Sequence, residues 1–256
     1  MAILLAILGF LVGGLANQLG SDLPARRKLS RPYCPYCGQE RPRWQWLALP
    51  VFLAGRATCT NLECKRRIRW RHPLVEIGLA VSFGYLWFAL GPYDQPAQYV
   101  KLFFYLIYAA IFALILITDM ERRLILHVVT FPAIAIAIIA SFFLPDILPK
   151  AALTGGAVGF FTFLLLVIVG KIAFGSGAMG EGDITLATFV GLVTGFPLVI
   201  EALVLTTFIG AAISFVLLIT RVRTLRDYIP YGPFLIIGAV ITMLWGYPIA
   251  DWYLRR

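Results

Sequence analysis

The sequence contains a series of apolar stretches, each close to the length that a helix needs to cross a lipid bilayer. Such a helix requires about 20 mainly apolar residues. The stretches that meet or approach this length are 2–20, 74–91, 98–118, 124–144, 151–173, 184–198, 199–220 and 231–252. Of all residues, 60% are hydrophobic, whereas soluble domains are nearer half apolar. The sequence therefore predicts an all-α polytopic membrane protein with about eight transmembrane helices.

The join between the sixth and seventh stretches leaves one alternative open. The stretch 184–198 is short, and only the tight junction at Phe196-Pro197 separates it from the next apolar segment. A seven-span arrangement with a re-entrant segment at this junction is the alternative to eight full spans.

The distribution of Lys and Arg predicts the orientation of the chain, because cytoplasmic loops of membrane proteins carry an excess of these residues. If the loop 21–73 is cytoplasmic, alternation of the spans places nearly all Lys and Arg on the same side. The exceptions are Lys101, Lys150, Arg255 and Arg256. The net charge of +9 is thus explained by membrane topology, so we expect a lipid bilayer and no nucleic acid as partner, with both termini outside the cytoplasm.

The predicted topology divides the chain into three parts. We expect a first transmembrane helix at 1–20, a cytoplasmic cysteine-rich loop at 21–73, and a seven-helix transmembrane domain at 74–256.

The cytoplasmic loop contains all four cysteines of the chain, as Cys34-Pro-Tyr-Cys37 and Cys59-Thr-Asn-Leu-Glu-Cys64. Two close pairs are typical of zinc ribbons, in which four thiolates surround Zn²⁺. A loop of this length builds little core, and metal binding would order it. We predict a structural zinc site in a zinc-ribbon-like loop. Free or redox-active thiols are the alternative.

Two aspartates lie where an apolar stretch meets a polar break. Asp119 follows 111–118, and Asp183 precedes 184–198. Ionisable groups at membrane depth are costly and indicate function. The predicted topology places both at the cytoplasmic ends of their helices. Helix capping would explain Asp183 as an N-cap, but it explains Asp119 poorly, because a negative charge at a helix C-terminus opposes the macrodipole.

Two neighbouring carboxyl groups that share one proton can act as a general base and a general acid in peptide hydrolysis. We therefore predict that Asp119 and Asp183 form a catalytic pair of an intramembrane aspartic protease, with the assignment of base and acid left open. The preceding segment 174–183 is rich in glycine. Because glycine lacks a Cβ atom, Gly180 and Gly182 could bring the backbone close to a bound peptide.

Several motifs together resemble the type IV prepilin peptidases, the bifunctional leader peptidase/N-methyltransferases of type IV pilus and type II secretion systems. The matching stretches are Asn17 with Leu23-Pro24, the two Cys pairs, His72-Pro-Leu-Val-Glu76, Thr118-Asp119, Gly180-Glu-Gly-Asp183 and Pro230-Tyr-Gly-Pro-Phe234. The sequence departs from the usual family pattern at Leu126, where the family has Pro, at Thr185, where it has Lys, and in the longer spacing of the second Cys pair.

The resemblance implies a multi-pass protein of the bacterial inner membrane that cleaves the leader of prepilins or pseudopilins at the cytoplasmic face. It further implies N-methylation of the new N-terminal residue with S-adenosylmethionine. We see no Rossmann-type glycine motif, so the methyltransferase expectation depends on the resemblance. Glu76, near a cytoplasmic helix end, is the candidate residue for that activity. The alternative is that Glu76 has no catalytic role and is an acid at the membrane interface that pairs with a nearby arginine.

Two other functions remain as hypotheses. The first is a non-enzymatic membrane scaffold or a transporter with a zinc-ordered loop. A transporter usually places its charges near the bilayer midplane, whereas both aspartates here are predicted at one face. The second is a peptidase that does not methylate its product.

Overall fold

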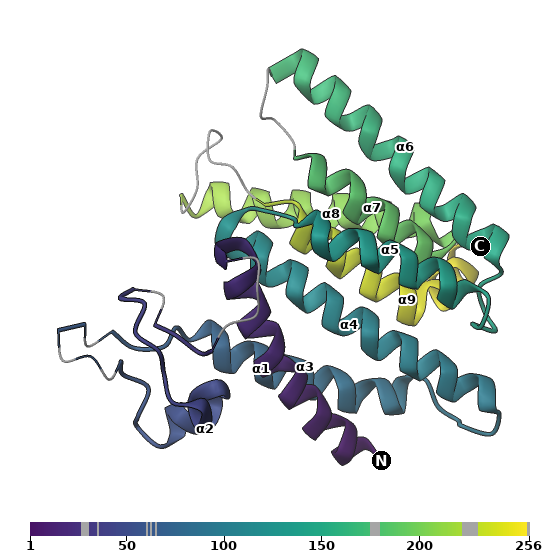
Figure 1. Cartoon of the computed structure of the whole chain (residues 1–256). Helices are drawn as coiled ribbons and strands as arrows, with labels where there is room; N and C mark the ends of the chain where they lie inside the picture. The colour runs from purple at the N-terminus through teal and green to yellow at the C-terminus, as the bar shows by residue number, and fades with distance from the viewer. Residues whose placement is uncertain are drawn as a thin grey trace. The chain divides into compact units, whose positions relative to one another are not determined.

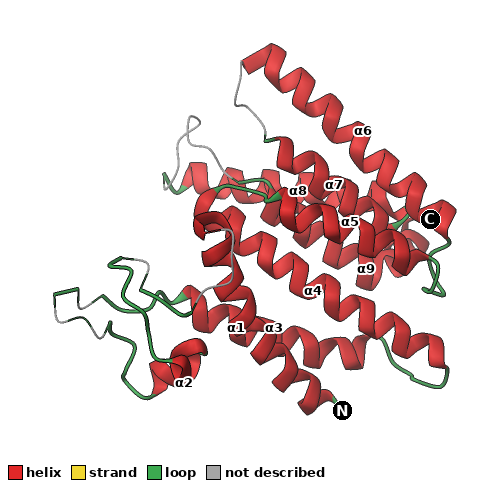
Figure 2. Ribbon diagram, viewed as in Figure 1, coloured by secondary structure: helices red, strands yellow, loops and turns green. Residues whose placement is uncertain are grey.

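The computed structural model describes residues 1–26, 31–34, 36–59, 61, 63–64, 66–174, 180–221 and 230–254. These residues form helices joined by loops (Figure 2). Extended pairing in this part of the chain is limited to two isolated β-bridges, Tyr33–Glu40 and Thr58–Arg67. The all-α prediction is therefore confirmed.

A helix lies at each of the apolar stretches identified in the sequence (Figure 1). In chain order these helices are α1 (Ala2–Arg26), α3 (Arg71–Ala89), α4 (Pro96–Arg122), α5 (His127–Ser141), α6 (Pro149–Phe174), α7 (Glu181–Thr194), α8 (Leu198–Ile219) and α9 (Gly232–Leu254). A 3₁₀ helix, η1 (Arg43–Trp46), and a short helix, α2 (Ala48–Leu53), lie in the loop between α1 and α3.

Within the described residues, 5 helices are long and apolar enough to cross a membrane, namely α1, α4, α6, α8 and α9. Helix α5 is apolar but shorter. Helix α7 has 14 residues, and at a rise of 1.5 Å per residue it extends about 21 Å, less than the roughly 30 Å hydrocarbon core. The sixth segment is therefore a short helix, as its sequence indicated, and the architecture is that of a multi-pass membrane protein.

The chain divides into two compact units, Met1–Thr118 and Asp119–Arg256, which are described separately. In the first unit, α1 packs closely along α3 (Figure 1). A Cβ atom at Gly13 would lie 2.6 Å from the Cα atom of Glu76. Glycine at this position therefore allows the two helix backbones to approach more closely than larger residues would permit.

The loop of the first unit has a small core of its own. Ala48 and Val51 of α2 pack with Ala57 and Ile68, and all four are buried. A core of four residues contributes little stabilisation, so the loop needs further support of the kind that the cysteines and Glu76 provide.

Helix α7 forms the centre of the second unit, with contacts to α5, α6, α8 and α9. Its closest neighbour is α6, which runs beside it (Figure 1). A Cβ atom at Gly155 or Gly159 would clash with a carbonyl oxygen of α7, and one at Gly191 would clash with α6. Glycines on both helices thus permit close packing of α6 against α7. This packing fixes the helix whose first turn carries Asp183.

Candidate active site and metal centre

Asp119 lies in the last turn of α4 and is buried, with 3% of its surface exposed. Helix α4 ends at Arg122. The following residue, Arg123, adopts a left-handed φ of 53° and donates its N–H to the Asp119 carbonyl at 2.8 Å. The predicted position at a helix C-terminus is confirmed. A buried carboxylate is unfavourable there, so local helix stability does not account for it.

Asp183 is buried in the first turn of α7. We expected it as the N-cap of a helix starting at residue 184, and this was wrong, because α7 begins at Glu181. Asp183 is instead the third residue of the helix, and its Oδ2 accepts the N–H of Gly180 at 3.2 Å. The carboxylate thus satisfies one of the free N–H groups of the helix N-terminus.

The second unit brings these two carboxyl groups together. The charge of Asp119 acts on Asp183, although two whole helices, α5 and α6, separate the two residues along the chain. The N–H of Gly232 faces the Asp119 carboxyl. The Oδ2 atom of Asp119 is buried and has no hydrogen-bond partner in the described part of the chain. Interacting carboxyl groups of this kind can hold one proton between them.

The residues that surround the pair come from the start of α9 and from the α4–α5 connection. Tyr231 lies close enough to interact with the charge of Asp183, and a Cβ atom on Gly232 would overlap the Asp119 carboxyl. Both residues belong to the motif at 230–234, but the sequence predicted no role for them. The glycine in this motif is explained by the structure, because no side chain fits beside the buried carboxyl group.

The two glycines predicted to face a substrate have different local roles. Gly180 has an extended backbone with φ −80° and ψ 144°. Gly182 lies inside α7, where a Cβ atom would be 2.7 Å from the Cβ atom of Ile125. The missing side chain of Gly182 thus permits contact with the α4–α5 connection. The other glycines of this segment, Gly175 and Gly177, lie outside the described residues.

Two of the three departures from the family pattern, Leu126 and Thr185, leave the local backbone intact. Leu126 is the N-cap of α5 with φ −82° and ψ 119°, a conformation close to the one that proline imposes. Thr185 donates its hydroxyl to the Gly182 carbonyl at 2.9 Å. Leucine therefore begins α5 in a backbone geometry that Pro would also give, and Thr185 bonds within its own helix.

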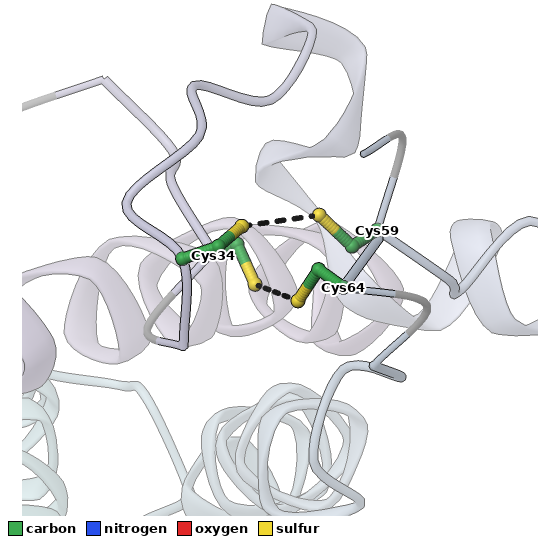
Figure 3. Close-up of side chains that lie close together, drawn as sticks. Cys34, Cys59 and Cys64 are labelled. Atoms are coloured by element: carbon green, nitrogen blue, oxygen red, sulfur yellow. Dashed lines mark hydrogen bonds between the residues drawn. The ribbon is translucent and has the colours of Figure 1, made fainter. Parts of the chain in front are cut away.

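The four cysteines converge in the loop of the first unit, and Figure 3 shows the sulfur atoms of Cys34, Cys59 and Cys64 turned toward one another. All four Sγ atoms lie within 4.8 Å of one another. The Cys34–Cys64 sulfurs are 3.8 Å apart, and the Cys37–Cys59 sulfurs 3.6 Å. Tetrahedral bonds of about 2.3 Å to one zinc ion would place sulfurs roughly 3.8 Å apart, so the geometry fits a single four-coordinate metal ion.

Backbone turns present each cysteine pair. Gly38 has φ 74° and donates its N–H to the Cys34 carbonyl at 2.9 Å, while Cys34 donates to the Gln39 carbonyl. In the second pair Cys59 donates its N–H to the Arg66 carbonyl at 2.9 Å. Each β-bridge closes the turn that carries one pair. The longer second spacing therefore still forms a turn that directs both sulfurs inward.

The electrostatics of the thiols also favour a bound cation. Burial acts to raise the pKa of Cys34, but hydrogen bonds from the Tyr36 and Cys37 backbone and the Arg41 side chain lower it to about 6. Burial and the neighbouring thiols raise the pKa of Cys59 to about 11. One thiolate forms readily, and its negative charge then opposes ionisation of the neighbouring thiols. A divalent metal ion is therefore needed to hold several thiolates together.

Glu76 is fully buried at the entry to α3. Its Oε1 accepts the N–H of Ala48 at 2.6 Å, and its Oε2 accepts the N–H of Leu49 at 2.8 Å. Both carboxylate oxygens are thus engaged by the start of α2, and among the described residues no arginine forms an ion pair with them. The sequence offered no local signal for this contact, which joins positions 28 residues apart.

Comparison with known proteins places these features in a family. The profile of the "Type IV leader peptidase family" matches residues 106–215, and that of the "Bacterial Peptidase A24 N-terminal domain" matches residues 7–90. The range matched by the first profile includes Asp119 and Asp183, and the range matched by the second includes the four cysteines and Glu76. No solved structure matches the chain significantly.

Three relatives carry the name prepilin leader peptidase/N-methyltransferase. The protein of Pseudomonas aeruginosa is 30% identical, with 87% of this chain and 74% of the relative aligned. That of Pseudomonas putida is 28% identical over 95% of this chain and 90% of its own. That of Bacillus subtilis is 25% identical over 100% and 98%. The resemblance inferred from the motifs is confirmed.

Proposed function

The chain belongs to the type IV leader peptidase family, and from this membership we propose that it removes the leader peptide of type IV prepilins or pseudopilins and N-methylates the new N-terminal residue. The names of the relatives support both activities. They do not favour the alternative of a scaffold or transporter.

The observation that carries the peptidase activity is the buried pair of Asp119 and Asp183. With one proton shared, the ionised carboxyl would accept a proton from the attacking water, and the protonated one would donate to the leaving amine. The N–H groups of Gly180 and Gly232 face one carboxyl each and would hold the pair in orientation during this exchange.

The excess of Lys and Arg supports a location of this pair at the cytoplasmic face of the bacterial inner membrane. Arg122 follows Asp119 in the last turn of α4, and Lys171 lies in the last turn of α6 with an ion pair of 3.5 Å to Glu181. Arg122 thus shares a helix end with Asp119, and Lys171 pairs with a residue in the first turn of α7, which carries Asp183. A prepilin whose apolar helix lies in the bilayer would then present its basic leader and cleavage site at this depth.

The loop 21–73 would serve the methyltransferase activity, and the domain 74–256 would carry the peptidase. Cys34, Cys37, Cys59 and Cys64 would hold one structural zinc ion and so order the loop. S-adenosylmethionine, when bound, supplies the methyl group. Glu76 remains the predicted methyltransferase residue, and its two hydrogen bonds to α2 support an indirect role, in which it fixes the loop to α3.

The test of the peptidase proposal is replacement of each aspartate by its isosteric amide. Asp119→Asn and Asp183→Asn should each lower the rate of leader cleavage by about 100- to 10,000-fold, because each removes one proton-transfer group. Cleavage of a purified prepilin in detergent would be followed by mass spectrometry. The control Asp94→Asn changes an exposed aspartate in a loop and should leave the rate unchanged.

Methylation of a synthetic peptide that begins at the mature N-terminus separates loss of cleavage from loss of folding. Both aspartate variants should still add one methyl group to this peptide. Cleavage at the wild-type rate by either variant would exclude the aspartate pair, whatever the methylation result.

A further inference from the structure

The first unit contains a cluster of polar side chains, most of them buried, where α1, the cysteine loop and the start of α3 meet. It is here called the polar cluster. Its members are Asn17, Asp22, Arg41, Gln45 and His72. Asn17, Asp22, Arg41 and Gln45 are each exposed by 7% or less. Buried polar groups are ordinarily hydrogen-bonded, so a group of this size calls for an account of its partners.

Several contacts join the members of the polar cluster. Asn17 donates its side-chain amide to the His72 carbonyl at 2.8 Å. The charge of Arg41 acts on His72, which places the guanidinium near the start of α3. Arg71 lies on the same side, with its Nη2 atom 3.1 Å from His72 Nε2 and 3.2 Å from Ser21 Oγ.

Gln45 approaches from the loop. It precedes Trp46 and Leu47, and a Leu47 methyl carbon would lie 2.7 Å from a Cβ atom at Gly14. Gly14 lies on α1 one turn before Asn17. The loop segment that carries Gln45 therefore lies against the part of α1 that carries Asn17.

Three atoms of the polar cluster have no hydrogen-bond partner within the described ranges. They are Asn17 Oδ1, Gln45 Oε1 and Arg41 Nε. The two amide oxygens require donors, and the guanidinium nitrogen requires an acceptor. Because the side chains are more than nine-tenths buried, bulk solvent does not satisfy them. A bound molecule with both a donor and an acceptor would complete all three.

The charges of the region favour an anionic acceptor. Three arginines, Arg41, Arg69 and Arg71, bring positive charge to the start of α3. The buried carboxylates of Asp22 and Glu76 already accept hydrogen bonds from the protein. An α-amino acid group carries a carboxylate and an ammonium on one carbon, so it supplies an anionic acceptor beside a donor. Guanidinium groups bind carboxylates strongly, and neutral amide oxygens accept from ammonium groups.

From this match we propose that the polar cluster binds the α-amino-carboxylate end of S-adenosylmethionine, with Arg41 on the carboxylate and Asn17 and Gln45 on the amine. The inference rests on the proposed methyltransferase function. The Arg41 side chain also hydrogen-bonds Cys34, so the metal-ordered turn would position one wall of this site. All residues of the proposed site belong to the first unit.

The test compares two ligands that differ at the proposed contact. S-adenosylhomocysteine carries the amino acid group, and 5′-methylthioadenosine lacks it. Binding of each to the purified full-length protein in detergent would be measured by calorimetry. The wild type should prefer S-adenosylhomocysteine by about tenfold or more, as expected for hydrogen bonds to charged groups. Gln45→Leu should bring that preference close to one while leaving the affinity for 5′-methylthioadenosine unchanged.

Two further variants sharpen the result. Gln45→Glu keeps an acceptor oxygen and should retain most of the preference. Gln39→Leu changes an exposed glutamine of the same loop and should behave as wild type. A preference that survives in Gln45→Leu would overturn the inference and leave water as the occupant of the cluster. An equal loss for both ligands would also overturn it, since that pattern indicates a disturbed fold.

A wild-type protein that binds neither ligand and transfers no methyl group would refute the proposed methyltransferase function itself. If instead the wild type binds S-adenosylhomocysteine and Gln45→Leu does not change its preference, only the proposed binding site fails. The two failures are therefore distinguishable. Leader cleavage by the second unit, measured in parallel on every variant, checks that the protein has inserted and folded.

Discussion

Substitution of Gly232 by alanine tests the proposed geometry of the peptidase site without removing either carboxyl group. An added Cβ atom would lie 3.2 Å from the Asp119 Cγ atom and closer still to Oδ2. Since ordinary carbon–oxygen contacts lie at about 3.5 Å, the carboxyl group must move by about 1 Å. A displacement of that size at a reacting group costs about 100-fold in rate.

The assay is leader cleavage under single-turnover conditions, with thermal unfolding measured in the same detergent. Gly232→Ala should cleave about 100-fold more slowly than wild type while its unfolding midpoint changes little. Gly238→Ala is the matched control on the same helix, because its Cβ atom would strike Thr206 of α8 and not a carboxyl group. That variant should lower the unfolding midpoint with a smaller effect on the rate.

A Gly232→Ala protein that cleaves at the wild-type rate would refute this reasoning. It would mean that Asp119 does not act on the substrate from the position that it has beside Gly232 in this structure.

Three further predictions concern the supports of the two units. Gly191→Ala should lower the unfolding free energy by about 1–3 kcal/mol through overpacking against α6. The control Gly78→Ala should be nearly neutral, because its Cβ atom meets nothing within 4 Å. Equal unfolding midpoints for the two variants would contradict this prediction. Glu76→Gln should weaken the attachment of α2 by about 1–3 kcal/mol, seen as faster amide exchange at Ala48 and Leu49, and unchanged exchange would count against the anchor. Cys59→Ser, or chelation of the wild type, should release bound zinc measured by elemental mass spectrometry, with leader cleavage retained; a protein purified without metal would exclude a structural zinc.

Much of the fold could be predicted from the sequence because membrane helices are specified locally. Each long helix coincides with an apolar stretch, since a bilayer leaves the backbone of such a stretch few alternatives to internal hydrogen bonding. The short sixth segment was also visible in the sequence, as the limited apolar run before Phe196-Pro197. The start of α7 was misplaced by three residues, because the N-cap Gly180 has no side chain and Asp183 caps the helix from its third position.

The roles of single side chains were less accessible. Glu76 was a candidate for chemistry on the basis of its motif, yet both of its oxygens bind a helix start 28 residues earlier in the chain. Asn17 belongs to a family motif, but the burial of its unsatisfied oxygen depends on the contacts that α1 makes with α3 and with the loop. Contacts of this kind depend on loop closure, which residue spacing does not encode.

Sequence alone determined the number and order of the apolar helices, the gathering of four cysteines in one loop, and the placement of Asp119 and Asp183 at helix ends. These features follow from local composition and from the cost of charge in a membrane. Only the tertiary structure decided which groups meet. The glycines of α6 and α7 allow the close packing that fixes Asp183, Gly232 faces Asp119, and Glu76 holds the cysteine loop on α3. The physical reason is that buried hydrogen bonds and close backbone contacts form between segments remote in sequence, where the shape of the whole unit selects the partners.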